Sequence, residues 1–198
     1  PLSVAIICMN NQRSLPRTLG SVRGLAAEIV AVDSGSTDDT IPILEAAGAR
    51  VIHQPWLGHV KQKQVALDAC SQPWILSLDS DESVEPELAA AVRAAVERDD
   101  TAIHGYEVNR RVHAWQPEWR LRLVRAGRAR WAGYDPHDKL EAIDPHARVE
   151  RLTGVLRHDS IESVAAFLAK QADHAAIAAR SYHEMGRAGS VGRLVTSP

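Results

Sequence analysis

The 198 residues of this chain suffice for one well-packed hydrophobic core and leave little room for two full domains. Hydrophobic residues make up 45% of the sequence and charged residues 24%, which are values typical of a globular protein and exclude a disordered chain. The formal net charge of −2 argues against general nucleic-acid binding.

The first hundred residues alternate between strand and helix patterns. Mostly apolar runs predict strands at 2–8, 28–32, 50–53 and 74–78. Helical periodicity predicts helices after Ser14, a candidate N-cap, and then at 40–47, 59–70 and from Pro86 onward. Because strand–helix units of this kind make right-handed crossovers, we expect a parallel sheet.

The second half has a different pattern. Residues 104–109 and 119–125 alternate like strands, but no long helix separates them, which favours antiparallel additions to the sheet. A last helix is predicted at 163–183. We therefore expect a single α/β domain over 1–198, with a nucleotide-type half at 1–103 and a more irregular half at 104–198.

Cysteine content and hydropathy indicate the compartment. Cys8 and Cys70 show no metal-binding spacing and are predicted to be buried free thiols in a reducing cytoplasm. No stretch approaches the roughly 20 apolar residues of a membrane span. Basic residues near the C-terminus favour peripheral association with the inner face of an anionic membrane; they are Lys170, Arg180, Arg187 and Arg193.

Polar residues follow three of the predicted strands. Asn10 follows the first strand, Asp33 ends the second, and Asp79 and Asp81 follow the fourth. In open α/β sheets, ligands bind beyond the carboxyl ends of the strands. We expect these four side chains to converge at one edge.

Asp79 and Asp81 are two residues apart, which places both carboxylates on one side of an extended backbone. Carboxylates held so closely repel each other unless a cation lies between them, and hard oxygen ligands favour Mg²⁺ or Mn²⁺. The alternative is a solvated acidic turn before the next helix, with Glu82 and Glu85 enriching its N-terminal side.

Asp33 opens the loop at 33–38 and could bind a uracil imide or a ribose hydroxyl. The alternative is an Asx turn, with Asp38 or Asp39 capping the next helix. Neither a Walker loop nor a G-x-G-x-x-G pattern occurs, so P-loop ATPases and ordinary NAD-binding proteins lose their main support.

Several motifs in order resemble family-2 glycosyltransferases, and among them the bacterial enzymes that add glucose to the lipopolysaccharide inner core. The resemblance extends from residue 2 to about residue 183. It is carried by VDSGSTD at 32–38, HQPWLG at 53–58, QK at 62–63 and WILSLDSDE at 74–82. It implies a GT-A fold, in which a Rossmann-like mixed sheet is flanked by helices, and an inverting mechanism.

The resemblance also assigns roles to residues of the donor site. Asp33 would contact the base of a nucleoside diphosphate sugar with Asn10 nearby, and Lys63 would help to hold the donor. Asp79 would approach the ribose or the metal. Asp81 would bind the metal, and His158 matches a histidine that serves such folds as a metal or diphosphate ligand.

The general base is implied by a His-Glu pair of the family, which corresponds here to His137-Asp138. We assign the base to Asp138, one methylene shorter than Glu, with Asp135 as the local rival. Two departures affect the first loop, because Asn11 stands where relatives commonly carry an acid and Cys8 where they carry Thr.

The region 110–130 is rich in arginine and is bordered by tryptophan. Arginine pairs with phosphate and carboxylate, and indole rings stack on sugars, which favours an anionic glycolipid or saccharide acceptor. Trp115 and Arg122 match the family's Trp-x-Pro…Arg-Leu pattern. The alternative is a solvated strand face whose arginine stems cover apolar surface.

The predicted activity is metal-dependent transfer of a hexose, with glucose from UDP-glucose as the expected donor. One alternative is a non-catalytic domain that binds a sugar nucleotide or a glycan. A Mg²⁺-dependent phosphatase is a weaker alternative, because such enzymes place a nucleophilic Asp after the first strand, where this chain has Asn10.

Overall fold

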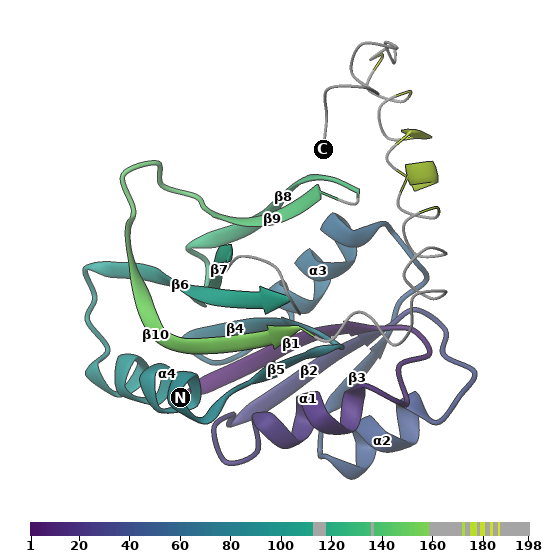
Figure 1. Ribbon diagram of the computed structural model, residues 1–198, viewed down its shortest axis with the longest axis horizontal. Helices are drawn as coiled ribbons and strands as arrows, with labels where there is room; N and C mark the ends of the chain where they lie inside the picture. Colours follow the sequence, from purple (N-terminus) through teal and green to yellow (C-terminus); the bar gives the residue numbers. More distant parts are fainter. Residues whose placement is uncertain are drawn as a thin grey trace.

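The computed structural model describes residues 1–112, 118–135 and 137–158, and beyond them residues 172, 175–177, 179, 180, 183 and 186. Helices and strands alternate through the first half, and strands dominate the second (Figure 1). In chain order the elements are β1 (Leu2–Cys8), α1 (Leu15–Ser21), β2 (Glu28–Asp33), α2 (Thr40–Ala46), β3 (Arg50–His53), α3 (His59–Asp68), β4 (Trp74–Asp79), β5 (Glu82–Val84), α4 (Pro86–Arg98), β6 (Ile103–Val112), β7 (Glu118–Arg125), β8 (Ala129–Tyr134), β9 (His137–Ala142) and β10 (Arg148–His158).

The main sheet has the strand order β3-β2-β1-β4-β7-β6-β10-β5. Strands β1 to β4 pair in parallel, and β7 runs antiparallel to both β4 and β6. The predicted α/β class is therefore confirmed, with a parallel N-terminal half and an antiparallel addition. Four elements were not predicted: β5, the hairpin β8–β9, and β10, which pairs in parallel with β6.

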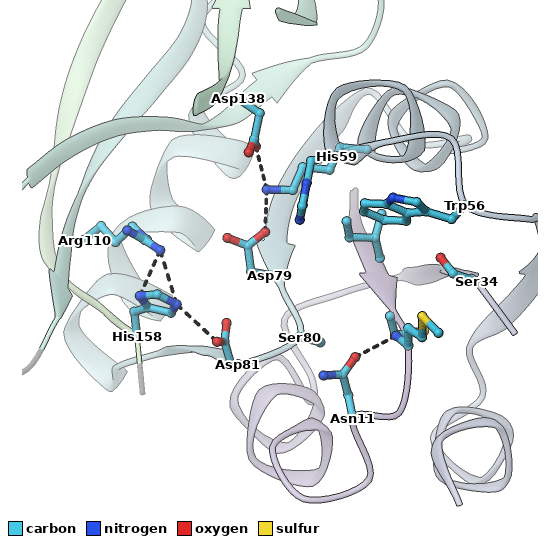
Figure 2. Close-up of a pocket in the computed structure, with 14 residues that line it drawn as sticks. Asn11, Ser34, Trp56, His59, Asp79, Ser80, Asp81, Arg110, Asp138 and His158 are labelled. Carbon is cyan, nitrogen blue, oxygen red and sulfur yellow. Dashed lines mark hydrogen bonds and ion pairs between the residues drawn. The ribbon is translucent and has the colours of Figure 1, made fainter. Parts of the chain in front are cut away.

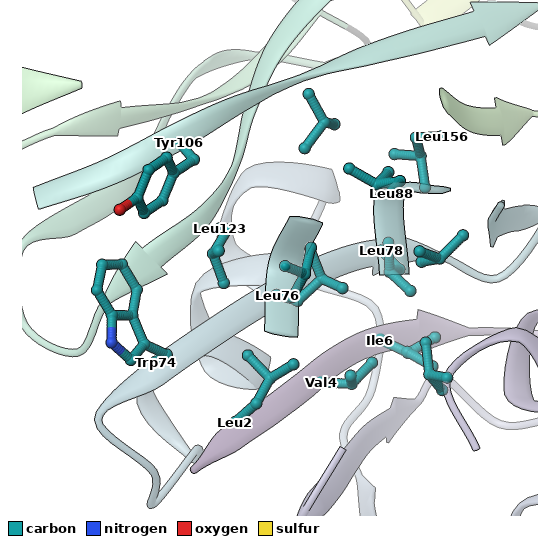
Figure 3. Packing of buried hydrophobic residues seen from close by; sticks show 14 of the residues in the cluster. Leu2, Val4, Ile6, Trp74, Leu76, Leu78, Leu88, Tyr106, Leu123 and Leu156 are labelled. Carbon is teal, nitrogen blue, oxygen red and sulfur yellow. The ribbon is translucent and has the colours of Figure 1, made fainter. Parts of the chain in front are cut away.

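One face of the sheet packs against α1, α2 and α4 (Figure 1). Alternate residues of β1, namely Leu2, Val4 and Ile6, point into this core because successive side chains of a strand face opposite sides. Leu88 of α4 packs in the same cluster, as Figure 3 shows. This layer fixes the strand ends that carry Asp79 and Asp81.

The opposite face is covered by α3 and by the hairpin β8–β9. Ala5 of β1 points to this side, where Leu67 of α3 meets Trp131 of β8 and Leu140 of β9. The hairpin packs on α3 and β7 and thereby lies over the carboxyl edge of the parallel strands (Figure 1). Asp138 of β9 is thus brought close to Lys63 of α3.

The helix boundaries follow the sequence closely, with one difference in capping. Ser14 precedes α1 as predicted, but its side chain makes no capping hydrogen bond. The predicted helix at 163–183 lies mostly outside the described residues, of which 172, 175–177, 179, 180 and 183 are helical. Cys8 is a buried free thiol and Cys70 a partly buried one. Among the helices described, none is both long enough and apolar enough to span a bilayer.

Candidate active site

The carboxyl ends of β1, β2 and β4 open onto a cavity of about 530 Å³. Its walls also include α3, β6, β9 and β10, so both halves of the chain contribute (Figure 2). Polar groups from distant segments point into it, including Asp79, Asp81, Asp138 and His158. Of the four side chains predicted to converge at one sheet edge, Asp79 and Asp81 line the cavity, whereas Asn10 and Asp33 do not.

Asp33 is fully buried and shapes the loop after β2. Its Oδ2 accepts hydrogen bonds from the backbone N–H groups of Gly35 (2.9 Å) and Ser36 (3.0 Å), and its Oδ1 accepts one from the Ser36 hydroxyl. Burial alone would raise the pKa of this carboxyl, but the hydrogen bonds from Ser36 and Gly35 lower it below its ordinary value. The structure shows the Asx turn that was the alternative for Asp33. Contact between Asp33 and a nucleotide base stays a prediction.

The loop after β1 is tied to the loop after β2. Asn10, with a left-handed φ of 55°, donates its N–H to the Ser36 hydroxyl at 2.9 Å, and its Oδ1 accepts the N–H of Thr37 at 2.8 Å. Asn10 is exposed and lies outside the cavity wall, whereas its neighbour Asn11 lines the cavity. The described contacts of Asn10 thus shape the loop, and its role beside a donor stays a prediction.

Lys63 lies at the centre of the charged residues of the cavity. Its ammonium group is 2.7 Å from Asp79 Oδ1 and 2.7 Å from Asp138 Oδ2, and its side chain is 8% exposed. Burial alone would lower the pKa of Lys63, but the Asp79 and Asp138 carboxylates raise it, so the amine stays charged. Lys63 therefore bridges a residue of the parallel sheet and a residue of the hairpin.

Asp79 is held by two cations. Besides Lys63, Arg122 approaches its Oδ2 at 3.2 Å. Burial alone would raise the pKa of Asp79, but the Lys63 and Arg122 charges hold it well below its ordinary range. Asp79 is therefore a carboxylate whose negative charge is balanced within the protein.

Glu82 connects Arg110 and Arg122 with the backbone of Asp79. It is fully buried, and its Oε1 accepts hydrogen bonds from Arg110 Nε (2.6 Å) and from the Arg122 guanidinium (2.8 Å). Its Oε2 accepts the N–H of Asp79 at 2.9 Å. The alternative of a solvated acidic turn does not hold for Glu82, because its carboxylate lies between two arginines.

Arg122 was predicted to bind an acceptor, and the structure places it inside the protein. Its side chain is 7% exposed and bonds to Asp79 and Glu82. Acceptor binding through this residue stays a prediction. Trp115, the other residue predicted to bind an acceptor, lies outside the described residues.

Asp81 and His158 meet on the far wall of the cavity (Figure 2). The Arg110 guanidinium lies 2.8 Å from His158 Nδ1 and 3.3 Å from Nε2. His158 Nε2 also lies 3.2 Å from Asp81 Oδ2. One carboxylate and one imidazole are thus placed side by side and face the cavity.

This pair suits a divalent ion whose remaining ligands come from a substrate. In residues 1–112, 118–135 and 137–158, no group of three or more His, Cys, Asp or Glu side chains is arranged to hold a metal ion. Mg²⁺ is commonly held by one or two carboxylates together with substrate phosphates, and Mn²⁺ accepts the same ligands. Asp81 and His158 meet that smaller requirement.

Asp135, the rival candidate base, is engaged elsewhere. Its Oδ2 accepts the N–H of His59 at 3.0 Å, and its Oδ1 accepts that of Val60 at 3.4 Å, so it caps α3. Gly58 allows this approach, because a Cβ there would lie 2.6 Å from Asp135 Oδ2. Asp138 instead lines the cavity.

Two residues of the cavity wall were missed by sequence reasoning. Trp56, with 47% of its surface exposed, and His59 stack edge to face with ring centroids 4.7 Å apart. Both lie in or next to the segment 53–58 that carries the family resemblance. An exposed tryptophan beside a predicted helix start was the available signal.

Comparison with known proteins gives the family. The sequence profile of glycosyl transferase family 2 matches residues 3–142, and the chain belongs to this family. The lipopolysaccharide core biosynthesis glycosyltransferase LpsC of Rhizobium meliloti is 37% identical over 174 residues, which cover 80% of this chain and 63% of LpsC. An uncharacterized glycosyltransferase of Rickettsia felis is 45% identical over 87 residues, 44% of this chain and 31% of that protein. The chain thus spans less than two thirds of these relatives.

Solved structures overlap with this chain over little more than half of its length. TarS of S. aureus aligns with 58% of this chain and 37% of its own, with a TM-score of 0.48 and 21% identity. Glucosyl-3-phosphoglycerate synthase of Mycobacterium tuberculosis, solved with Mn²⁺, UDP and glucosyl-3-phosphoglycerate, aligns with 56% and 44%, with a TM-score of 0.47 and 24% identity.

Proposed function

We propose that this protein transfers a hexose, glucose from UDP-glucose, to a bacterial saccharide or glycolipid acceptor such as lipopolysaccharide core, with inversion at the sugar carbon. The observation that carries the proposal is one cavity at the carboxyl edge of the sheet into which Lys63, Asp79, Asp81, Asp138 and His158 all project. Membership of glycosyl transferase family 2 supports the reaction class. The relative LpsC supports the acceptor class.

The donor diphosphate would lie between the loop after β1 and the end of β4. Asp81 and His158 are the residues that would hold Mg²⁺ or Mn²⁺ there. Bound to the diphosphate, such an ion supplies positive charge that stabilises the leaving group. Lys63 adds a second positive charge on the side of the hairpin.

Asp138 would act as the general base. In an inverting transfer, a carboxylate facing the attacking hydroxyl accepts its proton while the bond to the diphosphate breaks. Asp138 is 11% exposed, lines the cavity and is held by Lys63 through Oδ2. Asp135 is less suited to the role, because both of its oxygens accept N–H groups at the start of α3.

The place of action is part of the same proposal. We infer transfer in the cytoplasm, with peripheral association at the inner face of the membrane where a glycolipid acceptor would be presented. The basic residues near the C-terminus that favour such an association lie, except for Arg180, outside the described residues.

A donor panel tests the proposal. UDP-glucose, UDP-galactose, UDP-N-acetylglucosamine and GDP-mannose are titrated by calorimetry with and without Mn²⁺, and UDP release is followed with each. We expect UDP-glucose to bind in a Mn²⁺-dependent manner, and Asp81→Ala to weaken that binding at least about tenfold, or about 1.4 kcal/mol. Asp68→Asn, an exposed acid of α3 outside the cavity, is the matched control.

The alternatives give different outcomes. Binding without UDP release, in the presence of saccharide acceptors, would identify a non-catalytic sugar-nucleotide domain. Release of inorganic phosphate from simple phosphomonoesters would identify a phosphatase. If no nucleotide sugar binds, or if Asp81→Ala binds and reacts like the parent, the proposed mechanism is wrong.

A further inference from the structure

A second cavity of about 280 Å³ adjoins the first. Its walls come from β6, β7 and the hairpin β8–β9, and the two cavities share Lys63, Asp79, Arg110 and Asp138. The candidate base therefore faces both. A substrate in the second cavity would lie within reach of Asp138 without competing with a donor for the loop after β1.

The charges of the second cavity are unequal. Five cationic side chains and three acidic ones line it. Each acid already has a cation of the protein: Asp79 and Asp138 bind Lys63, and Glu107 binds Arg151 at 2.9 Å. The cations are paired as well, Arg110 and Arg122 with the buried Glu82.

Two of the cations form ion pairs that are exposed to solvent. Arg120 pairs with Glu118, and Lys139 pairs with Glu141, in each case two residues away on the same strand. Arg120 is 43% exposed and Lys139 57% exposed, and ion pairs at such positions contribute little to stability. Both side chains can turn toward a ligand at small cost.

Two buried donors in the wall have no acceptor. Arg122 Nε and Trp131 Nε1 are inaccessible to solvent and make no hydrogen bond with the part of the chain that the structure describes. Both residues line the second cavity, and they are 5% and 6% exposed. A buried donor without an acceptor is unfavourable, so a ligand oxygen that reached either N–H after a movement of the surrounding side chains would relieve this cost.

The face of Trp131 is already covered. Lys63 Nζ lies 4.6 Å from the centroid of its ring, and the Arg122 guanidinium carbon lies 5.8 Å from it. A sugar ring cannot stack on that face while these cations remain. The other indole of the wall, Trp119, is 36% exposed and has the Arg151 guanidinium carbon 4.6 Å from its ring centroid. Around Trp131, recognition would therefore depend on N–H donors and positive charge, which select oxyanions.

We propose that the second cavity binds an anionic group, a phosphate or a carboxylate, carried by the acceptor sugar. Arg120 and Lys139 supply charge at the rim, and Arg122 and Trp131 supply N–H donors inside. The identity of the ligand as an acceptor rests on the proposed glycosyl transfer, whereas the anion-binding site rests on the residues of this cavity alone. The group would hold an acceptor hydroxyl next to Asp138.

Binding without any donor tests this inference. Glucose 6-phosphate, glucuronate and glucose are titrated into the whole chain while the indole N–H signal of Trp131, assigned with Trp131→Phe, is followed by NMR. We expect glucose 6-phosphate or glucuronate to shift that signal and glucose to leave it unchanged. Arg120→Ala and Lys139→Ala should each raise the dissociation constant at least about fivefold, since both remove a charge contact. The two arms separate a phosphate from a carboxylate ligand.

The matched control is Arg130→Ala, which removes an exposed arginine of β8 outside the cavity and should leave binding unchanged. The inference is overturned if neither anionic sugar shifts the signal, or if Arg120→Ala and Lys139→Ala bind like the parent. UDP is titrated separately. Binding of UDP without the sugar anion contradicts this inference only, and binding of the sugar anion without any nucleotide sugar contradicts only the proposed function.

Discussion

The two sides of the main cavity are built from different interactions. In the loop after β2, Asp33 bonds to Gly35 and Ser36, two and three residues further along the chain. On the opposite side, charged groups meet from far apart: Lys63 and Asp138 are separated by 75 residues, and Asp81 and His158 by 77. The hydrogen bonds of Asp33 to this loop are thus local, whereas the charge contacts of the opposite side are long-range.

The hydrogen bonds of Asp33 shape the site, whereas the charged residues of the opposite side are the ones proposed to take part in the reaction. Local bonds around Asp33 fix the loop shape and can be lost one at a time. The charge contacts are buried and share members, so removal of one residue leaves others unpaired at a high cost. The following substitutions test that contrast from the largest expected effect to the smallest.

Glu82→Ala should have the largest effect on stability. It leaves the guanidinium groups of Arg110 and Arg122 without their common carboxylate, and Arg122 is buried. Breaking a buried ion pair from one side costs about 3–5 kcal/mol. Urea unfolding at neutral pH measures the change.

Glu118→Ala is the matched control for Glu82. Glu118 also contacts an arginine, Arg110 at 3.6 Å, but its side chain is 45% exposed. An exposed pair contributes about 0–1 kcal/mol, so the variant should unfold almost like the parent. Equal losses in the two variants would contradict the importance given to burial.

Lys63→Met should reduce both stability and turnover. Without the ammonium group, Asp79 and Asp138 lose the cation that both contact at 2.7 Å. We expect a fall in turnover of about a hundredfold, in the range that mutation of a charged transition-state contact produces. Steady-state kinetics with the best donor of the panel measures it, and Lys61→Met, an exposed lysine of the same helix, is the control. A parental rate would remove Lys63 from the mechanism.

Asp33→Asn should reduce stability less than Glu82→Ala does, and by an amount that depends on pH. The pKa of Asp33 lies below its ordinary value, because hydrogen bonds from Ser36 and Gly35 outweigh burial. Its stabilising contribution is therefore complete above the unfolded-state pKa of about 3.9 and is lost as the pH falls through the lower folded-state value. The variant should be less stable by about 1–3 kcal/mol at pH 7, and the gap should narrow near pH 3.

Urea titrations of the parent and of Asp33→Asn between pH 3 and pH 7 check this. A gap that stays constant over that range, or that widens toward pH 3, would contradict the account of the loop.

The strand–helix order of the first half could be predicted because local patterns determine it. Apolar runs such as 74–78 give the strands, and Gly48 and Pro86 mark helix boundaries. The location of Asp79 and Asp81 at a sheet edge followed from that order. The last strands could not be predicted, since β8 and β9 are short and β10 pairs with β6 across a long stretch of sequence.

The sequence predicted the residues of the candidate site better than the contacts between those residues. Asp81 and His158 were both singled out, but their meeting depends on β10 lying beside β5 and β6. A solvated turn stayed open as an alternative for Glu82, because nothing local shows that Arg110 and Arg122 reach it. Long-range ion pairs leave no periodic signal in a sequence.

The central claim, that Asp138 takes the proton of the acceptor, is tested most directly by Asp138→Asn beside Asp135→Asn. Donor affinity and single-turnover transfer are measured on both variants with the best donor. We predict that Asp138→Asn binds the donor like the parent and transfers at least about a hundredfold more slowly, as loss of a general base implies. Asp135→Asn should keep most of its transfer rate. Parental transfer by Asp138→Asn, or its loss in Asp135→Asn alone, would contradict the account.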